Sequence, residues 1–399
     1  MNAFKAAYCR TFQLALKAAL PFLPYRDPVI VDGVTDIPAV LAGIGKRKPL
    51  VVTGKTVRGL GLTDSLEESL NASGTAYVLF DGVSVNPTTA NVAAALELYK
   101  SEGCDSLVAV GGGSPMDCAK CVGALVARPN KTLDSLRGIL KVGKKIPTLI
   151  AVPTTAGTGS ETTLAAVIVD SVTRRKYAIS DFSLIPSYAV LDARMTATMP
   201  KRIAAATGMD ALTHAIEAYI GRGGNRSTRA DALDAAKLIF ENIESACEHG
   251  DEKSRLNMLT ASHKAGRAFS KAYVGYVHAL AHALGGKYDT PHGFANAVIL
   301  PVVLEEYGHA AHKRLCEIAV HCGLVDRNCD RADGAKALIT RIKKLNEKLE
   351  IPETIAELDE ADIAELARYA DREANPLYPV PVLWDADKLG AVYARLLSR

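Results

Sequence analysis

The first half of the chain alternates between short apolar runs and stretches in which apolar residues recur at helical spacing. The apolar runs have the length and composition of buried strands, and they lie at Pro49–Thr53, Ala76–Phe80, Ser106–Val110, Lys145–Pro153, Ala165–Asp170 and Tyr188–Leu191. The helical patterns between them cover Ser65–Ala72, Thr88–Ser101 and Met116–Val126. Strands that alternate with helices predict a parallel sheet with helices packed on it.

The pattern changes at Pro200, since from there to Arg399 almost every segment has helical periodicity. We therefore expect two domains: residues 1–199 as a Rossmann-like parallel α/β domain, and residues 200–399 as an all-helical domain. Residues 1–27 are expected to be an amphipathic helical extension of the first domain. Lys5, Arg10 and Lys17 interrupt the apolar residues of Ala3–Leu23, so no signal-peptide block forms.

Composition and charge exclude several classes of protein. A length of 399 residues exceeds what one core usually serves, and 48% hydrophobic with 23% charged residues is ordinary for a globular protein. The formal net charge of +3 comes from dispersed lysines and arginines, which argues against a nucleic-acid partner. No apolar window is long enough to cross a membrane. Eight cysteines without a signal peptide predict a reducing compartment, the cytoplasm.

The strongest chemical signal is a set of metal-ligand residue types in two short windows. Asp210 and His214 are four residues apart, as are His278 and His282, and His292 follows between Pro291 and Gly293. The i,i+4 spacing places both members of a pair on one helix face. A lone histidine is more often a packed side chain than a ligand. Here the pairs lie among apolar residues, where an unpartnered charge is costly, so we favour a shared metal. Imidazole and carboxylate donors suit Fe(II), Zn(II), Co(II) or Ni(II).

Two loops have the composition of phosphate-binding sites. Gly111–Gly112–Gly113–Ser114 stands between a predicted strand and a predicted helix, where glycines admit an anion close to free backbone N–H groups. A simple helix start is the alternative, since Ser114 and Asp117 are good residues for one. The second loop, residues 153–161, offers several hydroxyls and two glycines directly after another strand.

Taken together, these motifs resemble those of the iron-containing (group III) alcohol dehydrogenase family. The resemblance extends from roughly Pro28 to the C-terminus, and its markers are GGGSPMDCAK (111–120), PTTAGTGSE (153–161), GMDALTHAIEAY (208–219), HALAHALGG (278–286), PHGFANAVILP (291–301) and the turn at Asn375–Pro376. It implies a dehydroquinate synthase-like architecture, with an α/β domain that binds NAD(P) and a helical domain that binds the metal.

The resemblance also implies roles for particular residues. The metal ligands map to Asp210, His214, His278 and His292, while His282 maps to a histidine that faces the reacting centre without binding the metal. The expected cofactor residues are Gly54, Asn86, Gly111, Gly112, Gly113, Ser114, Asp117, Thr154, Thr155, Thr158, Ser160 and Lys176. The expected metal is Fe(2+), with Zn(2+) as an alternative.

The implied reaction is hydride transfer between the nicotinamide C4 and the carbon of a small primary alcohol or aldehyde. Three neutral histidines and one carboxylate leave a net charge of +1 on a divalent ion, which suits an incoming alkoxide. His282 is the candidate proton carrier. We expect a small-molecule substrate, a homo-oligomer of two or more chains, and neither a membrane nor a nucleic-acid partner.

Gly54 departs from the family pattern, in which an aspartate often ends this strand and binds the adenosine ribose. Without that carboxylate nothing repels the 2′-phosphate of NADP, and Lys55 or Arg58 could attract it. The alternative is that Gly54 only makes a tight turn, so NADP and NAD both stay open.

Two other functions remain. The fold would also suit a dehydroquinate synthase-like or glycerol dehydrogenase-like metal enzyme. The apolar residues around the metal windows favour a small aldehyde over a phosphorylated, carboxylated substrate. A structural metal-stabilised scaffold without catalysis is the third possibility, which the complete ligand set and glycine loops disfavour.

Overall fold

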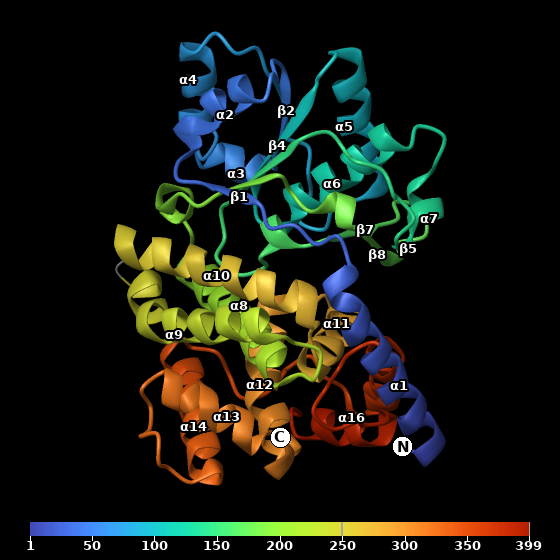
Figure 1. Ribbon diagram of the computed structural model, residues 1–399, viewed down its shortest axis with the longest axis vertical. Helices are drawn as coiled ribbons and strands as arrows, with labels where there is room; N and C mark the ends of the chain where they lie inside the picture. Colours follow the sequence, from blue (N-terminus) through green and yellow to red (C-terminus); the bar gives the residue numbers. More distant parts are fainter. Residues whose placement is uncertain (249, 399) are drawn as a thin grey trace. The chain divides into compact units, whose positions relative to one another are not determined.

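The computed structural model describes residues 1–248 and 250–398 (Figure 1). The chain divides into two compact units, one formed by Pro24–Met199 and the other by Met1–Leu23 with Pro200–Arg399. The predicted fold class is confirmed, since a parallel sheet with helices is followed by a helical region. Met1–Leu23, which we attached to the α/β region from the sequence, clusters with the helical unit.

Within the described residues, the main sheet of the first unit has six strands, all parallel. Their order across the sheet is β1 (Val29–Val31), β9 (Tyr188–Val190), β6 (Leu149–Pro153), β4 (Ser106–Gly111), β2 (Pro49–Val52) and β3 (Val78–Phe80). All but β1 coincide with predicted apolar runs. The neighbours β4 and β6 end at Gly111 and Pro153, which pair in register. Both glycine-containing loops therefore leave the same edge of the sheet side by side.

Both faces of the central strands β2, β4 and β6 are buried, which explains why these strands are continuous apolar runs. Leu50, Leu107 and Leu149 belong to one core cluster, whereas the next residue of each strand, Val51, Val108 and Ile150, belongs to the other. Helices α5 (Thr89–Ser101) and α6 (Gly113–Ala127) contribute to the first cluster. Helices α2 (Ile37–Gly43) and α4 (Asp64–Ala72) contribute to the second (Figure 1). Short helices α3 (Lys55–Gly59) and α7 (Leu133–Leu136) complete the unit.

A second, smaller sheet was not predicted. It contains β5 (Gly138–Ile139), β8 (Lys176–Ser180) and β7 (Ala165–Val169). The run at Ala165–Asp170 is a strand, but the expectation that it joins the parallel sheet is wrong, because β7 pairs antiparallel with β8. Backbone hydrogen bonds between Asp170 and residues 174–175 close a tight turn that forces this hairpin.

The other unit is built from helices around α8, whose residues from Gly208 to Ile220 are all buried. A helix that is apolar on nearly every side is placed in the interior rather than on the surface. Its helices are α1 (Ala3–Ala19), α8 (Lys201–Ile220), α9 (Arg226–Glu248), α10 (Glu252–Ala272), α11 (Tyr276–Tyr288), α12 (His292–Tyr307), α13 (His309–His321), α14 (Arg331–Lys348), α15 (Ile363–Ala374) and α16 (Ala386–Ala394). Across the described residues, none of the helices combines the length and apolar character of a membrane span.

Helix α1 is held against this unit through backbone carbonyls near the C-terminus. The Gln13 amide donates to the carbonyl oxygens of Pro376 and Tyr378, at 3.1 and 2.7 Å. The Arg10 guanidinium donates to those of Val380 and Pro381, at 2.7 and 2.9 Å. These polar groups are largely buried and paired, so they fix the helix in one position.

Candidate metal centre

Four side chains from three helices of the helical unit converge on one point. Asp210 and His214 come from α8, His278 from α11, and His292 is the first residue of α12. One potential ligand atom from each lies within 4.8 Å of those from the other three. Asp210, His214 and His278 are buried, and His292 is partly exposed. These four residues are the ones that the sequence singled out as metal ligands, and the fold brings them together.

The carboxylate of Asp210 lies at the middle of the contacts in this cluster. Its Oδ1 is 3.7 Å from Nε2 of His278 and 3.4 Å from Nε2 of His292, and it accepts a 2.7 Å hydrogen bond from the Asn296 amide. The rings of His214 and His278 stack with their centroids 4.5 Å apart. The i,i+4 spacing accounts for the pair on α8, whereas the other two donors depend on how α11 and α12 pack.

Close backbone packing brings His292 to α8. A Cβ at Gly293 would lie 2.3 Å from the carbonyl oxygen of Ala206, so only glycine allows α12 to begin this close to α8. The Pro291–His292–Gly293 turn therefore has a geometric reason for its glycine. It presents the His292 imidazole at the start of α12, and the next residue, Gly293, packs against α8, the helix that carries Asp210 and His214.

Burial disfavours the charged forms of two of the donors, Asp210 and His278. It raises the pKa of Asp210, against the opposing effect of His214 and Asn296. Burial and the neighbouring imidazoles lower the pKa of His278 well below its ordinary value, so this ring is neutral and able to bind a metal. Among the described residues, Nε2 of His278 is buried without a hydrogen-bond partner. A divalent cation would take up that lone pair and offset the buried carboxylate, so these residues fit such a metal.

His282 lies beside the cluster rather than in it. Its ring stacks on His292 with centroids 5.0 Å apart, and its side chain is 44% exposed. Its Nδ1 is 2.6 Å from Oε1 of Glu373, and that same oxygen accepts a 2.7 Å hydrogen bond from the Tyr378 hydroxyl. Glu373 was not identified from the sequence, although it lies at the end of α15, two residues before the Asn375–Pro376 turn that we singled out.

A second carboxylate that the sequence analysis missed is Glu217, which is buried on α8 and within 2.6 Å of Nδ1 of His278. Burial raises its pKa to about 7, against the opposing effect of backbone N–H groups at Gly275 and Val277. Its position offered a signal, because a glutamate seven residues after Asp210 and three after His214 lies on the same helix face.

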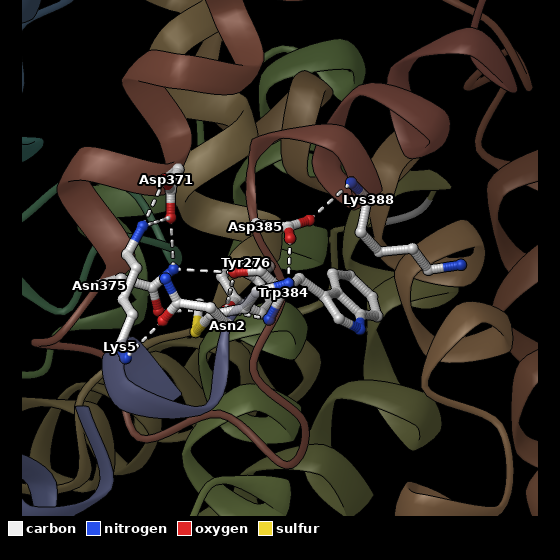
Figure 2. A network of polar contacts seen from close by, with 9 residues as sticks. Asn2, Lys5, Tyr276, Asp371, Asn375, Trp384, Asp385 and Lys388 are labelled. Atoms are coloured by element: carbon white, nitrogen blue, oxygen red, sulfur yellow. Dashed lines mark hydrogen bonds and ion pairs between the residues drawn. The ribbon is translucent and has the colours of Figure 1, made fainter. Parts of the chain in front are cut away.

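A polar network holds the start of α11, two residues before His278 (Figure 2). The Tyr276 hydroxyl donates to Oδ1 of Asn375 at 3.2 Å and accepts from the backbone N–H of Trp384 at 2.8 Å. The Asn375 amide donates to Asp371, which also accepts from Lys5 of α1. The Tyr276 ring stacks on Trp384. The Asn375–Pro376 turn thus anchors the helix that carries His278 and His282.

In the α/β unit, the expected cofactor residues of the two loops lie next to each other. Thr154 donates its backbone N–H to the carbonyl oxygen of Gly111, at 3.0 Å. A Cβ at Gly112 would lie 3.2 Å from Oγ1 of Thr155, and one at Gly113 would lie 3.6 Å from Thr158. Gly111 itself has a φ of +152° and leaves no room for a side chain beside Pro115. The Ser114 hydroxyl donates to the carbonyl oxygen of Val85.

Other expected cofactor residues use their side chains within the protein. Asp117 accepts from the Ser160 hydroxyl at 3.1 Å and from the backbone of Val167 at 3.0 Å. The Lys176 ammonium donates to Asn86 at 3.3 Å, so these two lie together at the surface. Lys120, which was not predicted from the sequence, is a fully buried lysine on α6 that binds the second loop.

Gly54 lies where the sequence placed it, between β2 and α3, but its surroundings were not foreseen. A Cβ there would lie 2.9 Å from the carbonyl oxygen of Val83, so a larger residue would crowd the backbone at this position. Glycine also leaves the position without a negative charge. The Arg58 guanidinium forms a 2.8 Å ion pair with Asp81. Of the two cations considered for a 2′-phosphate, Arg58 therefore already has an anionic partner.

Comparison with known proteins covers nearly the whole chain. A family model described as iron-containing alcohol dehydrogenase matches residues 30–193, and one for the C-terminal part of that family matches residues 204–397. The 1,3-propanediol dehydrogenase of Citrobacter freundii is 40% identical over 337 residues, 83% of this chain and 87% of the relative. The lactaldehyde reductase of Escherichia coli K12 is 36% identical over 329 residues, 82% and 86% of the two chains.

A solved structure has the same fold. The structure of a 1,3-propanediol oxidoreductase superposes with a TM-score of 0.89 at 35% sequence identity, and the alignment covers 93% of this chain and 99% of that one. Both units of the present chain are thus matched in sequence and in structure.

Proposed function

Because the chain belongs to the iron-containing alcohol dehydrogenase family, we propose that it interconverts small primary alcohols and their aldehydes by NAD(P)-linked hydride transfer at a divalent metal, Fe(2+) or Zn(2+). The observation that carries this proposal is the convergence of Asp210, His214, His278 and His292 within 4.8 Å in a buried cluster. The names of the relatives, a propanediol dehydrogenase and a lactaldehyde reductase, support a short aliphatic substrate.

The proposed ligands would hold the cation through one carboxylate oxygen and three imidazole nitrogens. A divalent cation bound there supplies Lewis acidity, which polarises a carbonyl oxygen and lowers the pKa of an alcohol. The protein's own contribution is to keep His278 neutral through burial and to place Asp210 against both His278 and His292. Asn296 fixes the Asp210 carboxylate, which therefore needs no rearrangement during turnover.

His282 is the proposed proton carrier between the reacting centre and solvent. It lies against His292 on one side, is partly exposed on the other, and holds Glu373 through Nδ1. An imidazole held by a carboxylate in this way has a fixed ring orientation. The direction of its second nitrogen, Nε2, therefore does not depend on whether substrate is bound.

For the cofactor, we propose that the loops at 111–114 and 153–161 bind the dinucleotide and that NADP(H) is accepted. The glycines leave the backbone open to a pyrophosphate at the start of α6. At the adenosine end Gly54 supplies no carboxylate to repel a 2′-phosphate, and Lys55 follows it at the first turn of α3. Because Arg58 is paired with Asp81, Lys55 is the cation we assign to the phosphate.

The test is cofactor oxidation by anaerobically Fe(II)-reconstituted protein, with NADH beside NADPH, against a panel of short aldehydes. A chelator-stripped sample is the control. We expect oxidation that depends on the metal and on the aldehyde, and NADPH use within an order of magnitude of NADH use. A strong preference for NADH would overturn the cofactor assignment. Silence with both cofactors in the metal-loaded protein would overturn the dehydrogenase proposal.

A further inference from the structure

The Glu217 side chain has an unusual set of partners for a carboxylate inside an apolar helix. It is 3% exposed and lies on α8, between the metal-ligand candidates of that helix and its C-terminal end. Oε2 accepts from the backbone N–H of Gly275 at 2.8 Å and is 2.6 Å from Nδ1 of His278. Oε1 accepts from the backbone N–H of Val277 at 2.8 Å. Both oxygens are therefore occupied by groups at the first turn of α11.

These contacts make Glu217 the cap of a helix to which it does not belong. Helix α11 begins after Gly275, which has no side chain to bind the free N–H groups of the first turn. A carboxylate at that end satisfies two of those donors and interacts favourably with the positive end of the helix dipole. A Cβ at Gly275 would lie 2.6 Å from Oε1 of Glu217, so the glycine is what admits the carboxylate.

The same carboxylate determines which nitrogen of His278 faces the metal cluster. Nδ1 points at Glu217, whereas Nε2 lies 3.7 Å from Oδ1 of Asp210. A neutral imidazole carries one proton, and the carboxylate holds it on Nδ1. The lone pair is then on Nε2, directed at the other donors. The carboxylate also makes that nitrogen more electron-rich and prevents the ring from turning.

Glu217 also changes the charge balance of the buried centre. A divalent cation with Asp210 alone leaves a net charge of +1 in a buried region, which is costly without a further partner. When the Glu217 carboxyl group on the other side of the His278 ring is ionised, the charges of the cation and the two carboxylates sum to zero. The buried carboxylate and the buried cation then stabilise each other.

We propose that Glu217 is a positioning residue for the metal site: it caps α11, fixes His278 with its proton on Nδ1, and thereby raises metal affinity. This inference rests on the proposed function, since it takes His278 as a metal ligand.

The experiment measures metal binding directly. Protein stripped with a chelator is titrated with Zn²⁺ in a calorimeter and with Co²⁺ in a spectrophotometer, for the wild type, Glu217→Gln and Glu217→Ala. We expect Glu217→Ala to weaken Zn²⁺ binding about 10- to 100-fold, the usual effect of losing such a partner. Glu217→Gln keeps an oxygen for Nδ1 but turns an N–H₂ group toward one backbone N–H, so its affinity is expected to lie in between. The visible Co²⁺ spectrum should change in both variants.

Asp181→Asn is the matched control. Asp181 is also a buried carboxylate that accepts backbone N–H groups, from Val142, Gly143 and Ser183, but it lies in the α/β unit. Its loss should lower the melting temperature of the metal-free protein without changing Zn²⁺ affinity or the Co²⁺ spectrum. If Glu217→Ala does not fold, the isosteric Glu217→Gln decides the question.

Different results would overturn the proposed function and the positioning role of Glu217. Wild-type protein that binds neither ion would overturn the proposed function and this inference with it. Normal binding by the wild type, together with unchanged affinity and Co²⁺ spectrum in a folded Glu217 variant, would overturn the positioning role alone.

Discussion

Two histidines one turn apart on α11 have different environments, so replacing each of them should have a different effect on the protein. His278 is buried, neutral, and directs Nε2 at Asp210, whereas His282 is partly exposed and held by Glu373. We expect His278→Ala to lose the metal, because a ligand atom is gone. We expect His282→Ala to keep the metal and to lower turnover about 100-fold, the usual contribution of a positioned proton carrier.

Metal content after gel filtration and steady-state turnover across pH separate these outcomes. Glu373→Gln, which retains the shape of the side chain that holds His282, serves as the intermediate case. His282→Ala with full activity and the wild-type pH profile would contradict the proton-carrying role. His278→Ala with a full complement of metal would contradict the ligand set.

Gly54 allows a separate test at the adenosine end of the cofactor. In Gly54→Asp the new carboxylate should repel a 2′-phosphate and accept from a ribose hydroxyl, shifting the ratio of kcat/KM toward NADH. The added Cβ also meets the Val83 carbonyl oxygen, so we expect a loss of stability of about 1 kcal/mol, at the low end of overpacking costs.

Gly54→Ala is the control for crowding, since it adds the same Cβ without the charge. Its melting temperature should fall like that of Gly54→Asp while its cofactor ratio stays near the wild type. If both variants shift the ratio equally, the steric contact and not the missing carboxylate determines cofactor choice.

At the scale of single residues, some members of the candidate site could be predicted from the sequence and others could not. The four donors were found because two lie at i,i+4 on one helix and the others sit in recognisable windows. Glu217 and Glu373 were not, because their histidine partners are 61 and 91 residues away along the chain. The packing of distant segments determines which histidine ring a buried carboxylate contacts. The local spacing of residues along the chain does not predict that contact.

At the scale of elements, Lys120 joins α6 to the loop after β6. Its ammonium donates to the carbonyl oxygens of Ser160 and Ala165, at 2.7 and 2.9 Å, and to the hydroxyls of Ser160 and Thr163, at 3.0 and 2.9 Å. Lys120→Met should leave these buried acceptors without a donor and cost about 3 kcal/mol. The loosened loop should also bind dinucleotide more weakly.

Chemical denaturation measures the first effect and a fluorescence titration with NADPH the second. Cys118→Ala is a suitable control, since it removes another fully buried side chain of α6 but none of these hydrogen bonds. Dinucleotide affinity that falls equally in both variants would mean that α6 packing, and not the lysine, holds the loop.

The same lysine predicts a pH dependence. Burial lowers the pKa of Lys120 to about 8, from 10.5 when exposed. Between these values the unfolded chain binds more protons than the folded one, so this group makes stability rise with pH. Below pH 8 both states are charged and the contribution is constant. The free energy of unfolding of the wild type relative to Lys120→Met should therefore grow between pH 8 and 10.5, and a constant difference would contradict the assignment.

Elements were predicted where the signal is local and missed where it is not. The runs that became β2, β3, β4, β6 and β9 are apolar on both faces, which is visible in sequence. The pairing of β7 with β8 was not, since it depends on a turn at 170–175 without a glycine or proline. The helical period of α1 was recognised from the sequence. Its packing against the helical unit was not predicted, because it depends on hydrogen bonds to backbone carbonyls at 376–381, which are not specified by residue type.

At the scale of the whole molecule, the two proposed ligands, the metal and the dinucleotide, are expected to bind to different units. All four metal donors lie in the helical unit, whereas the expected dinucleotide loops lie in Pro24–Met199. A ligand that binds only the folded state stabilises it by about 2.7 kcal/mol at a hundredfold excess over its Kd. Scanning calorimetry should therefore show that chelation lowers the transition of the helical unit, while NADPH raises that of the α/β unit.

The comparison of four samples makes this prediction specific: metal-loaded and stripped protein, each with and without NADPH. Independent units require that the shift caused by one ligand be the same whether or not the other is present. Lys120→Met should reduce only the shift caused by NADPH, and Glu217→Gln only the shift caused by metal. If either ligand instead moved both transitions equally, the units would unfold as one, and the metal centre would stabilise the dinucleotide-binding sheet as much as the helices that supply its ligands.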